Sequence, residues 1–215
     1  SQLTHNEYKW GSRDAIYFNE LTESRWDIKD FMNWVGSDKE QTKFRSILQK
    51  KGADLSQYSE SNLDVVYYPT NKIRVPVNKK NVLESGLVKE KDSALIVDYI
   101  DIDLPRSALP KNRILMLDII ANNDWKRPIY FSGGSFDAAE YIWMKDYLQL
   151  DGLVYKLVPI KTTNRSSYEM GRIDADLMYD IVKKWDWGNA GSSDIYHDPQ
   201  TRTQALSFRG NLARL

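Results

Sequence analysis

The chain contains no cysteine among its 215 residues. Disulfides, thiolate nucleophiles, zinc–thiolate sites and iron–sulfur clusters are therefore excluded. Histidine is also scarce, because the sequence has two, His5 and His197, at opposite ends. This scarcity disfavours a histidine-rich metal site or a catalytic triad built on histidine. We accordingly expect no metal ion and no cofactor.

An excess of charge of either sign is missing as well. Thirty basic and thirty acidic residues cancel, and they form no long block of one sign. Nucleic-acid-binding proteins usually carry a basic excess, so we expect no nucleic-acid partner. No apolar run reaches the roughly 18 residues of a membrane span. The start at Ser1 and the end within an amphipathic pattern predict a piece of a longer protein.

Aromatic residues, in contrast, are plentiful, with seven Trp and thirteen Tyr. Buried aromatic rings fill a core, whereas exposed rings form platforms for sugars or for partner proteins. The sequence leaves these alternatives open, although core packing is the commoner role.

Apolar periodicity predicts several helices. Ile28, Phe31 and Val35 share one helical face, which Gly36 ends. The spacing of Ser24 and Asp27 predicts a capping box at its start. Further helices are predicted at about 38–48, 110–120, 135–148 and 177–185, while 52–64 is expected to be a loop.

Short apolar or alternating runs predict strands at 14–18, 65–68, 73–77, 94–97, 100–104, 128–131 and 153–160. Pro76 lacks a backbone donor, which predicts an edge or bulged strand around it. The order of elements predicts an α+β fold, with a mixed β-sheet flanked by helices in a single compact domain. We expect this domain over 1–206, and the start of a following helical, repeat-like region over 207–215.

The most informative segment connects a predicted helix end to a short strand. Asn123, Asp124 and Trp125 include the planar polar and aromatic groups that bind sugars. Lys126 and Arg127 offer a second interpretation, because cations of this kind pair with phosphate or pyrophosphate groups. The alternative is a plain helix end, in which Asn stops the helix, the cations offset its dipole and Trp packs beneath.

Two other features have both a functional and a structural interpretation. Ser132, Gly133 and Gly134 form a strand-to-helix turn, which either presents N–H groups to an anion or is an ordinary tight turn. Asp101 and Asp103 share one strand face, where they either bind Ca²⁺ or act as an acid–base pair, or simply line an exposed sheet face.

Five blocks of this sequence resemble one family of large bacterial membrane proteins. They are GSRDAIY (11–17), YPTNKIRVPV (68–77), MLDIIANNDWKRPIYF (116–131), QLDGLVYKLVP (149–159) and SFRGNLARL (207–215). The chain is similar to the C-terminal soluble region of glycosyltransferase family 117, a domain of unknown function in Gram-negative bacteria. The blocks lie in order over nearly the whole chain.

The resemblance implies a parent enzyme that moves a sugar from a lipid-linked donor to an acceptor. It implies that the parent's membrane helices precede this chain and that the chain itself faces the periplasm, at the inner membrane. The catalytic acid of such enzymes is expected in a loop between membrane helices, so no catalytic residue carries over to this chain.

Two functions follow as expectations. The first is an accessory periplasmic domain that docks the acceptor or the lipid-linked sugar near 123–127 and 132–134 and is inactive alone. The alternative is an interaction or scaffolding module that binds envelope proteins and not sugar. A third, weaker hypothesis is a hydrolase that uses the pair Asp101 and Asp103.

Overall fold

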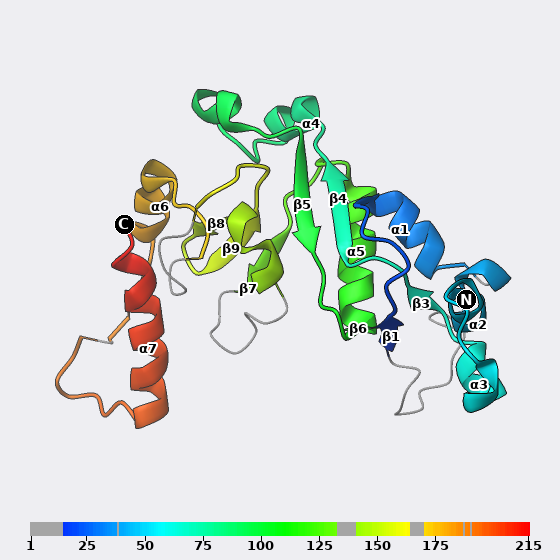
Figure 1. Cartoon of the computed structure of the whole chain (residues 1–215). Coiled ribbons are helices and arrows are strands. Elements are labelled where there is room, and N and C mark those ends of the chain that lie inside the picture. The colour runs from blue at the N-terminus through cyan, green and yellow to red at the C-terminus, as the bar shows by residue number, and fades with distance from the viewer. Residues whose placement is uncertain (1–14, 38, 133–140, 164–169, 187, 190) are drawn as a thin grey trace. The chain divides into compact units, whose positions relative to one another are not determined.

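The computed structural model describes residues 15–37, 39–132, 141–163, 170–186, 188–189 and 191–215, which Figure 1 shows as a ribbon. The chain forms two compact units. The first comprises 1–81 and 98–126, and the second comprises 82–97 and 127–215. Each unit combines helices with β-sheet, so the predicted α+β class is confirmed. The boundary at 81–82 falls within helix α4 (Lys79–Glu84).

The main sheet of the first unit has the order β2-β4-β5 and is mixed, as predicted. β4 runs parallel to β2 and antiparallel to β5. Its strands are β2 (Trp26–Asp27), β4 (Lys72–Pro76) and β5 (Tyr99–Asp103). The prediction that Pro76 marks an edge strand is wrong, since β4 is central. Pro76 is tolerated there because it is the last residue of the strand, where the ladder ends.

A second sheet of the first unit has the order β3-β1-β6. β1 pairs in parallel with β3 and antiparallel with β6. These strands are β1 (Ala15–Phe18), β3 (Tyr67–Tyr68) and β6 (Ala108–Pro110). The short β6 leads directly into the next helix, for which Pro110 is the N-cap.

Two helices of the first unit, α1 (Ile28–Val35) and α5 (Lys111–Asn123), contact each other. α1 also contacts β4, and its predicted apolar face is buried through Ile28, Phe31 and Val35. The predicted start of α1 needs correction. Asp27 itself is the N-cap, because its carboxylate accepts from the Lys29 amide at 2.8 Å.

A smaller cluster in the first unit joins α2 (Phe44–Lys50) to α3 (Glu60–Leu63). Phe44, Leu48 and Leu63 form its buried centre. α3 lies within the segment predicted to be a loop. Its four residues are too few to show helical periodicity, so the sequence pattern does not reveal it. Two 3₁₀ helices, Glu40–Thr42 and Leu55–Gln57, belong to the same region.

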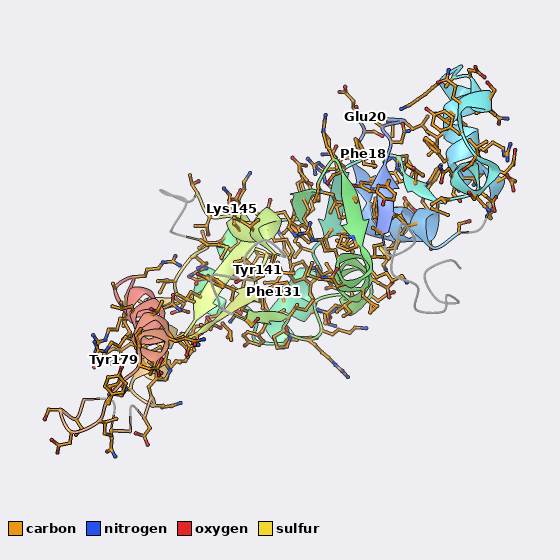
Figure 2. All side chains as sticks on the ribbon, turned by 90° about the horizontal axis from the view of Figure 1, so that it is seen from below. Phe18, Glu20, Phe131, Tyr141, Lys145 and Tyr179 are labelled. Carbon is orange, nitrogen blue, oxygen red and sulfur yellow. The ribbon has the colours of Figure 1, made fainter. Side chains whose placement is uncertain are left out.

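The second unit contains a sheet of order β7-β9-β8, antiparallel throughout. Its strands are β7 (Tyr130–Ser132), β8 (Leu148–Asp151) and β9 (Val154–Leu157). One face is apolar. Tyr141 stacks on Phe131 at 5.2 Å between ring centroids and lies 5.9 Å from the Tyr155 ring. Figure 2 labels Phe131 and Tyr141, which lie together in this core.

Two predictions in the second unit are corrected. An α-helix was expected over 135–148. In the described part of this segment the chain instead forms a 3₁₀ helix, Ile142–Tyr147, and then enters β8. The strand expected over 94–97 is largely absent. Leu95 ends a 3₁₀ helix, Glu90–Leu95, and Ile96 makes a single bridge to Ile160.

The remaining helices of the second unit are α6 (Ala175–Val182) and α7 (Pro199–Leu212). α6 matches the predicted stripe, and Met178 is its buried residue. α7 follows its N-cap Asp198 and runs continuously through residues 206 and 207. Arg214 donates to the carbonyl oxygens of Met170 and Gly171 at 2.9 and 3.0 Å.

Candidate functional site

The end of α5 has an unusual backbone. Asp124 has φ 47° and ψ 31°, and Trp125 follows with φ 60°. Both residues therefore have the positive φ of the left-handed region, although neither is glycine. Asp tolerates this region, but it is uncommon for a bulky residue such as Trp. Such strain persists where neighbouring contacts enforce it, and it often marks functional turns.

Two asparagines at the start of α4 hold this turn. Asn81 Nδ2 donates to the carboxylate and to the carbonyl oxygen of Asp124, each at 2.8 Å. Asn78 Nδ2 lies 3.3 Å from both carboxylate oxygens, and Asn78 Oδ1 accepts from the Asn81 amide at 3.2 Å. We call Asn78, Asn81 and Asp124 the Asn–Asp cluster. The hydrogen bonds that reach Asp124 are solvent-exposed, which leaves these polar groups accessible to a ligand.

Trp125 lies beneath this turn. Its side chain is 5% exposed, and Nε1 donates to the carbonyl oxygen of Pro76 at 2.7 Å. The indole therefore joins the end of α5 to the end of β4. Packed in this way, Trp125 presents no open ring face on which a sugar could stack. Its position therefore matches the alternative interpretation of this segment, in which Trp125 packs beneath a plain helix end.

The other residues predicted at this site lie near the cluster or in the second unit. The carbonyl oxygen of Asn123 accepts from the Lys126 amide at 3.0 Å. Lys126 is exposed, with Nζ 3.9 Å from a carboxylate oxygen of Asp124. Arg127 is exposed and begins the second unit's long segment. Of the eight predicted residues, Asn123, Asp124, Trp125 and Lys126 are therefore brought together in the first unit.

The predicted strand-to-helix turn is described in part. Ser132 ends β7 and is exposed, and its carbonyl oxygen accepts from the Tyr141 hydroxyl at 3.1 Å. Gly133 and Gly134 lie outside the described residues, so the anion-binding turn predicted there is not described either.

The predicted carboxylate pair on β5 is bound by arginines. Arg74 donates two hydrogen bonds to the carboxylate of Asp101, from Nε at 2.7 Å and from Nη2 at 3.0 Å. The hydrogen bond to Asp101 raises the pKa of Arg74. The guanidinium carbon also lies 3.5 Å from the centre of the Tyr99 ring. Arg74 therefore stays charged and neutralises the carboxylate beside it.

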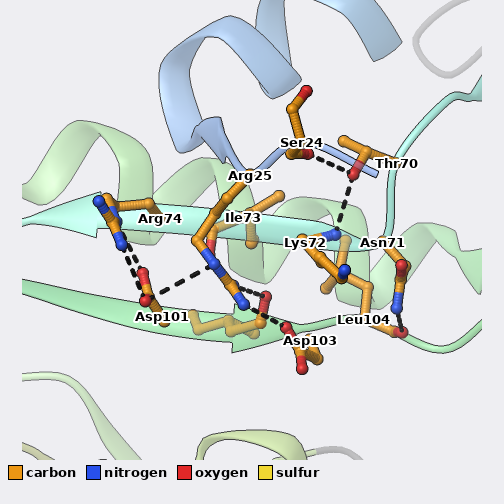
Figure 3. A network of polar contacts seen from close by, with 11 residues as sticks. Ser24, Arg25, Thr70, Asn71, Lys72, Ile73, Arg74, Asp101, Asp103 and Leu104 are labelled. Atoms are coloured by element: carbon orange, nitrogen blue, oxygen red, sulfur yellow. Dashed lines mark hydrogen bonds and ion pairs between the residues drawn. The ribbon is translucent and has the colours of Figure 1, made fainter. Parts of the chain in front are cut away.

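A second arginine completes this network, which Figure 3 shows from close by. Arg25 donates from Nη2 to Asp103 at 2.8 Å, and from Nη1 to the carbonyl oxygens of Ile73 and Ile102 at 2.9 and 3.1 Å. With an arginine bound to each carboxylate, Asp101 and Asp103 do not form a Ca²⁺ site or an acid–base pair. The interpretation as an ordinary exposed sheet face fits them.

Sequence reasoning missed Asn78 and Asn81 as members of the candidate site. The local signal was present only for Asn78, which directly precedes α4 and accepts from the Asn81 amide, as Asn does at helix starts. Their link to Asp124 spans more than forty residues, which a local pattern does not show.

Among the described residues, no group of three or more His, Asp or Glu residues is arranged to hold a metal ion. None of the helices there has the length and apolar character needed to cross a bilayer.

Comparison with known proteins gives one match. Searches of curated proteins and of solved structures found none. A family model described as TMEM260-associated domain 2 matches residues 1–177. This match covers the whole first unit, the sheet of the second unit and the Asn–Asp cluster. The chain therefore belongs to the TMEM260-associated domain 2 family, a domain that is associated with membrane proteins.

Proposed function

We propose that this chain is a periplasmic accessory domain of a polytopic glycosyltransferase-like membrane protein. In this proposal it docks the acceptor or the lipid-linked sugar at the Asn–Asp cluster and does not catalyse transfer alone. Membership of a membrane-protein-associated family supports a role beside a membrane partner. The proposal that the ligand is a sugar, and that the domain lies at the inner membrane, is based on the resemblance to glycosyltransferase family 117.

The observation that carries the proposal is the double left-handed turn at Asp124 and Trp125. Buried Trp125 and the two asparagines hold this turn against its strain. Strain maintained in this way is typical of binding turns that need a fixed geometry. The turn presents carboxamide groups, which donate to and accept from sugar hydroxyls, and a carboxylate, which accepts from them.

Lys126 adds a cation at the edge of this surface. Its side chain is 69% exposed, so the charge is available to a ligand. A phosphate of a lipid-linked donor would pair with it, while the sugar hydroxyls meet the Asn–Asp cluster. Trp125 serves as a positioning residue in this scheme, since its ring is buried.

The test is calorimetric titration of the chain with a panel of glycans and polyprenyl-phosphate-linked sugars. Saturable binding is expected, and Lys126→Met should weaken binding of phosphate-bearing ligands by about tenfold, the loss of one exposed charge-assisted contact. Lys50→Met, which removes an exposed lysine on α2, is the matched control and should bind normally. A flat panel with folded protein would contradict the proposal.

A specific observation favours the second candidate, an interaction module for envelope proteins. Leu115 and Ile119 are 61% and 55% exposed, and they lie one turn apart on α5. Exposed neighbouring apolar side chains commonly form part of a protein interface. Leu115→Ser combined with Ile119→Ser would abolish capture of an envelope protein if this candidate is correct, and would leave capture unchanged if it is not.

A further inference from the structure

The sheet of the second unit carries an unusual row of polar side chains. In the antiparallel register, Tyr130 of β7 lies opposite Lys156 of β9, and Lys156 lies opposite Gln149 of β8. A parallel bridge then places Arg172 beside Gln149. Directly paired residues project from the same face of a sheet. We call Tyr130, Lys156, Gln149 and Arg172 the polar row.

The middle of this row is buried together with a carboxylate. Gln149, Lys156 and Asp151 are each less than a tenth exposed. Lys156 Nζ lies 2.9 Å from Asp151 Oδ2, and Gln149 Nε2 donates to Asp151 Oδ1 at 2.8 Å. Removing an ion pair from water costs about as much as the pair returns, so stability alone is a weak reason for such a cluster.

Among the residues that the structure describes, the row has N–H groups without an acceptor. Both carboxylate oxygens of Asp151 are engaged, whereas the Lys156 ammonium has three N–H groups and gives one of them to Asp151. Arg172 Nη2 donates to Asp92 at 2.7 Å. Its Nη1 is buried and has no hydrogen-bond partner among the residues that the structure describes. The N–H groups that remain in the row are therefore able to bind a ligand that carries acceptor oxygens.

We propose that the polar row binds a tetrahedral oxyanion, either free phosphate or the phosphate group of a larger molecule, through Lys156 Nζ and Arg172 Nη1. A salt-bridged cation keeps its other N–H groups, and these form charge-assisted hydrogen bonds with anionic oxygens. Because Asp151 and Asp92 already offset the two charges, the row attracts its ligand through directed donors more than through net charge. Phosphate offers several acceptor oxygens to these donors, whereas chloride offers one acceptor centre.

One side of the row is open. Tyr130 is half exposed, and Ser132 lies two residues further along β7, on the same face and exposed. The rest of a phosphorylated molecule would leave the row past these two hydroxyls. This inference concerns the second unit alone and does not rest on sugar docking at the Asn–Asp cluster.

The experiment is calorimetric titration of the full chain with inorganic phosphate at constant ionic strength, with chloride as the reference salt. Saturable binding of phosphate is expected, with none of chloride. Glycerol 3-phosphate is titrated in parallel. Tighter binding of this ester would identify the phosphate of a larger molecule as the ligand, and tighter binding of inorganic phosphate would identify the free anion.

Three variants locate the binding. Arg172→Lys keeps a cation for Asp92 but lacks the Nη1 group, so phosphate affinity should fall by about tenfold or more. The double variant Lys156→Met with Asp151→Leu removes both charges together, which spares the fold an unpaired charge, and should lose binding. Lys145→Met is the control. Lys145 is exposed in the same unit (Figure 2), so binding should be unchanged.

Two results would overturn the inference. The first is a folded parent protein whose titration with phosphate shows no saturable heat beyond that of chloride. In that case the buried N–H groups are satisfied by water, not by an anion. The second is an Arg172→Lys protein that binds phosphate as tightly as the parent. Neither result would bear on ligand binding by the first unit.

Discussion

Trp125 shows how one side chain fixes a surface that it does not itself present. Its indole is buried and bound to the Pro76 carbonyl, while the residue before it, Asp124, faces solvent. The sequence predicted a helix end at this place from residue types alone. It did not predict the partners Asn78 and Asn81, because they come from a segment more than forty residues earlier in the chain.

The Trp125 hydrogen bond should contribute measurably to stability. Trp125→Phe keeps an aromatic ring but leaves the Pro76 carbonyl without its donor. The free energy of unfolding should fall by about 1–2 kcal/mol, the cost of losing a part-buried hydrogen bond and of a smaller ring. Urea denaturation would measure it. An unchanged midpoint would show that the indole N–H does not hold the turn.

Asp124 offers a matched test of backbone strain. Asp124→Ala and Asp124→Gly both remove the carboxylate that Asn78 and Asn81 bind, but only alanine carries a Cβ in the left-handed region. The glycine variant should therefore be the more stable by about 1 kcal/mol. Thermal or urea denaturation of the two proteins would decide it, and equal stabilities would argue against strain at this turn.

At the scale of elements, periodicity predicted α1 and α6 because each has an apolar stripe, which is buried in α1 and partly buried in α6. It missed β8, whose buried residues include Gln149 and Asp151. These polar residues are buried because they bind each other and Lys156, a partnership that is set by strand register. A hydrophobic pattern cannot reveal a strand that is buried through polar pairing.

The edge of the second unit's sheet depends on Gly171. Its φ is +71°, and a Cβ built there would lie 2.3 Å from the Leu148 carbonyl oxygen. Gly171→Ala should therefore lower the free energy of unfolding by at least about 2 kcal/mol. Gly86→Ala is the control, since Gly86 has a similar φ with nothing within 4 Å, and should cost about 1 kcal/mol. Equal losses of stability in the two variants would show that the positive φ accounts for the effect and that the contact with Leu148 does not contribute.

The N-cap of α6 should make stability depend on acid pH. Burial alone would raise the pKa of Asp174, but the Leu177 amide and Lys89 outweigh burial and hold that pKa below its usual value. A lowered folded pKa means that the contribution is complete above about pH 4 and is lost as pH falls through the folded pKa. Asp174→Asn should therefore lower stability at neutral pH and flatten its decline below pH 4. A parallel decline in both proteins would contradict this assignment.

At the scale of the whole molecule, composition and element order predicted the α+β class but not the division into two units. The second unit is discontinuous, because 82–97 belongs with 127–215. Contacts between distant residues join these segments, such as the ion pairs of Asp92 with Arg172 and of Lys89 with Asp174. Oppositely charged residues are common on any surface, so nothing in the sequence shows which of them pair.

The most direct test of sugar docking is to map the bound ligand by NMR on the ¹⁵N-labelled chain. A polyprenyl-phosphate-linked sugar should shift the side-chain amides of Asn78 and Asn81 and the indole N–H of Trp125, saturably and together. The backbone amides of Leu115 and Ile119 should stay in place. Shifts confined to the Leu115 and Ile119 face of α5, or no shifts at saturating ligand, would contradict docking at the Asn–Asp cluster.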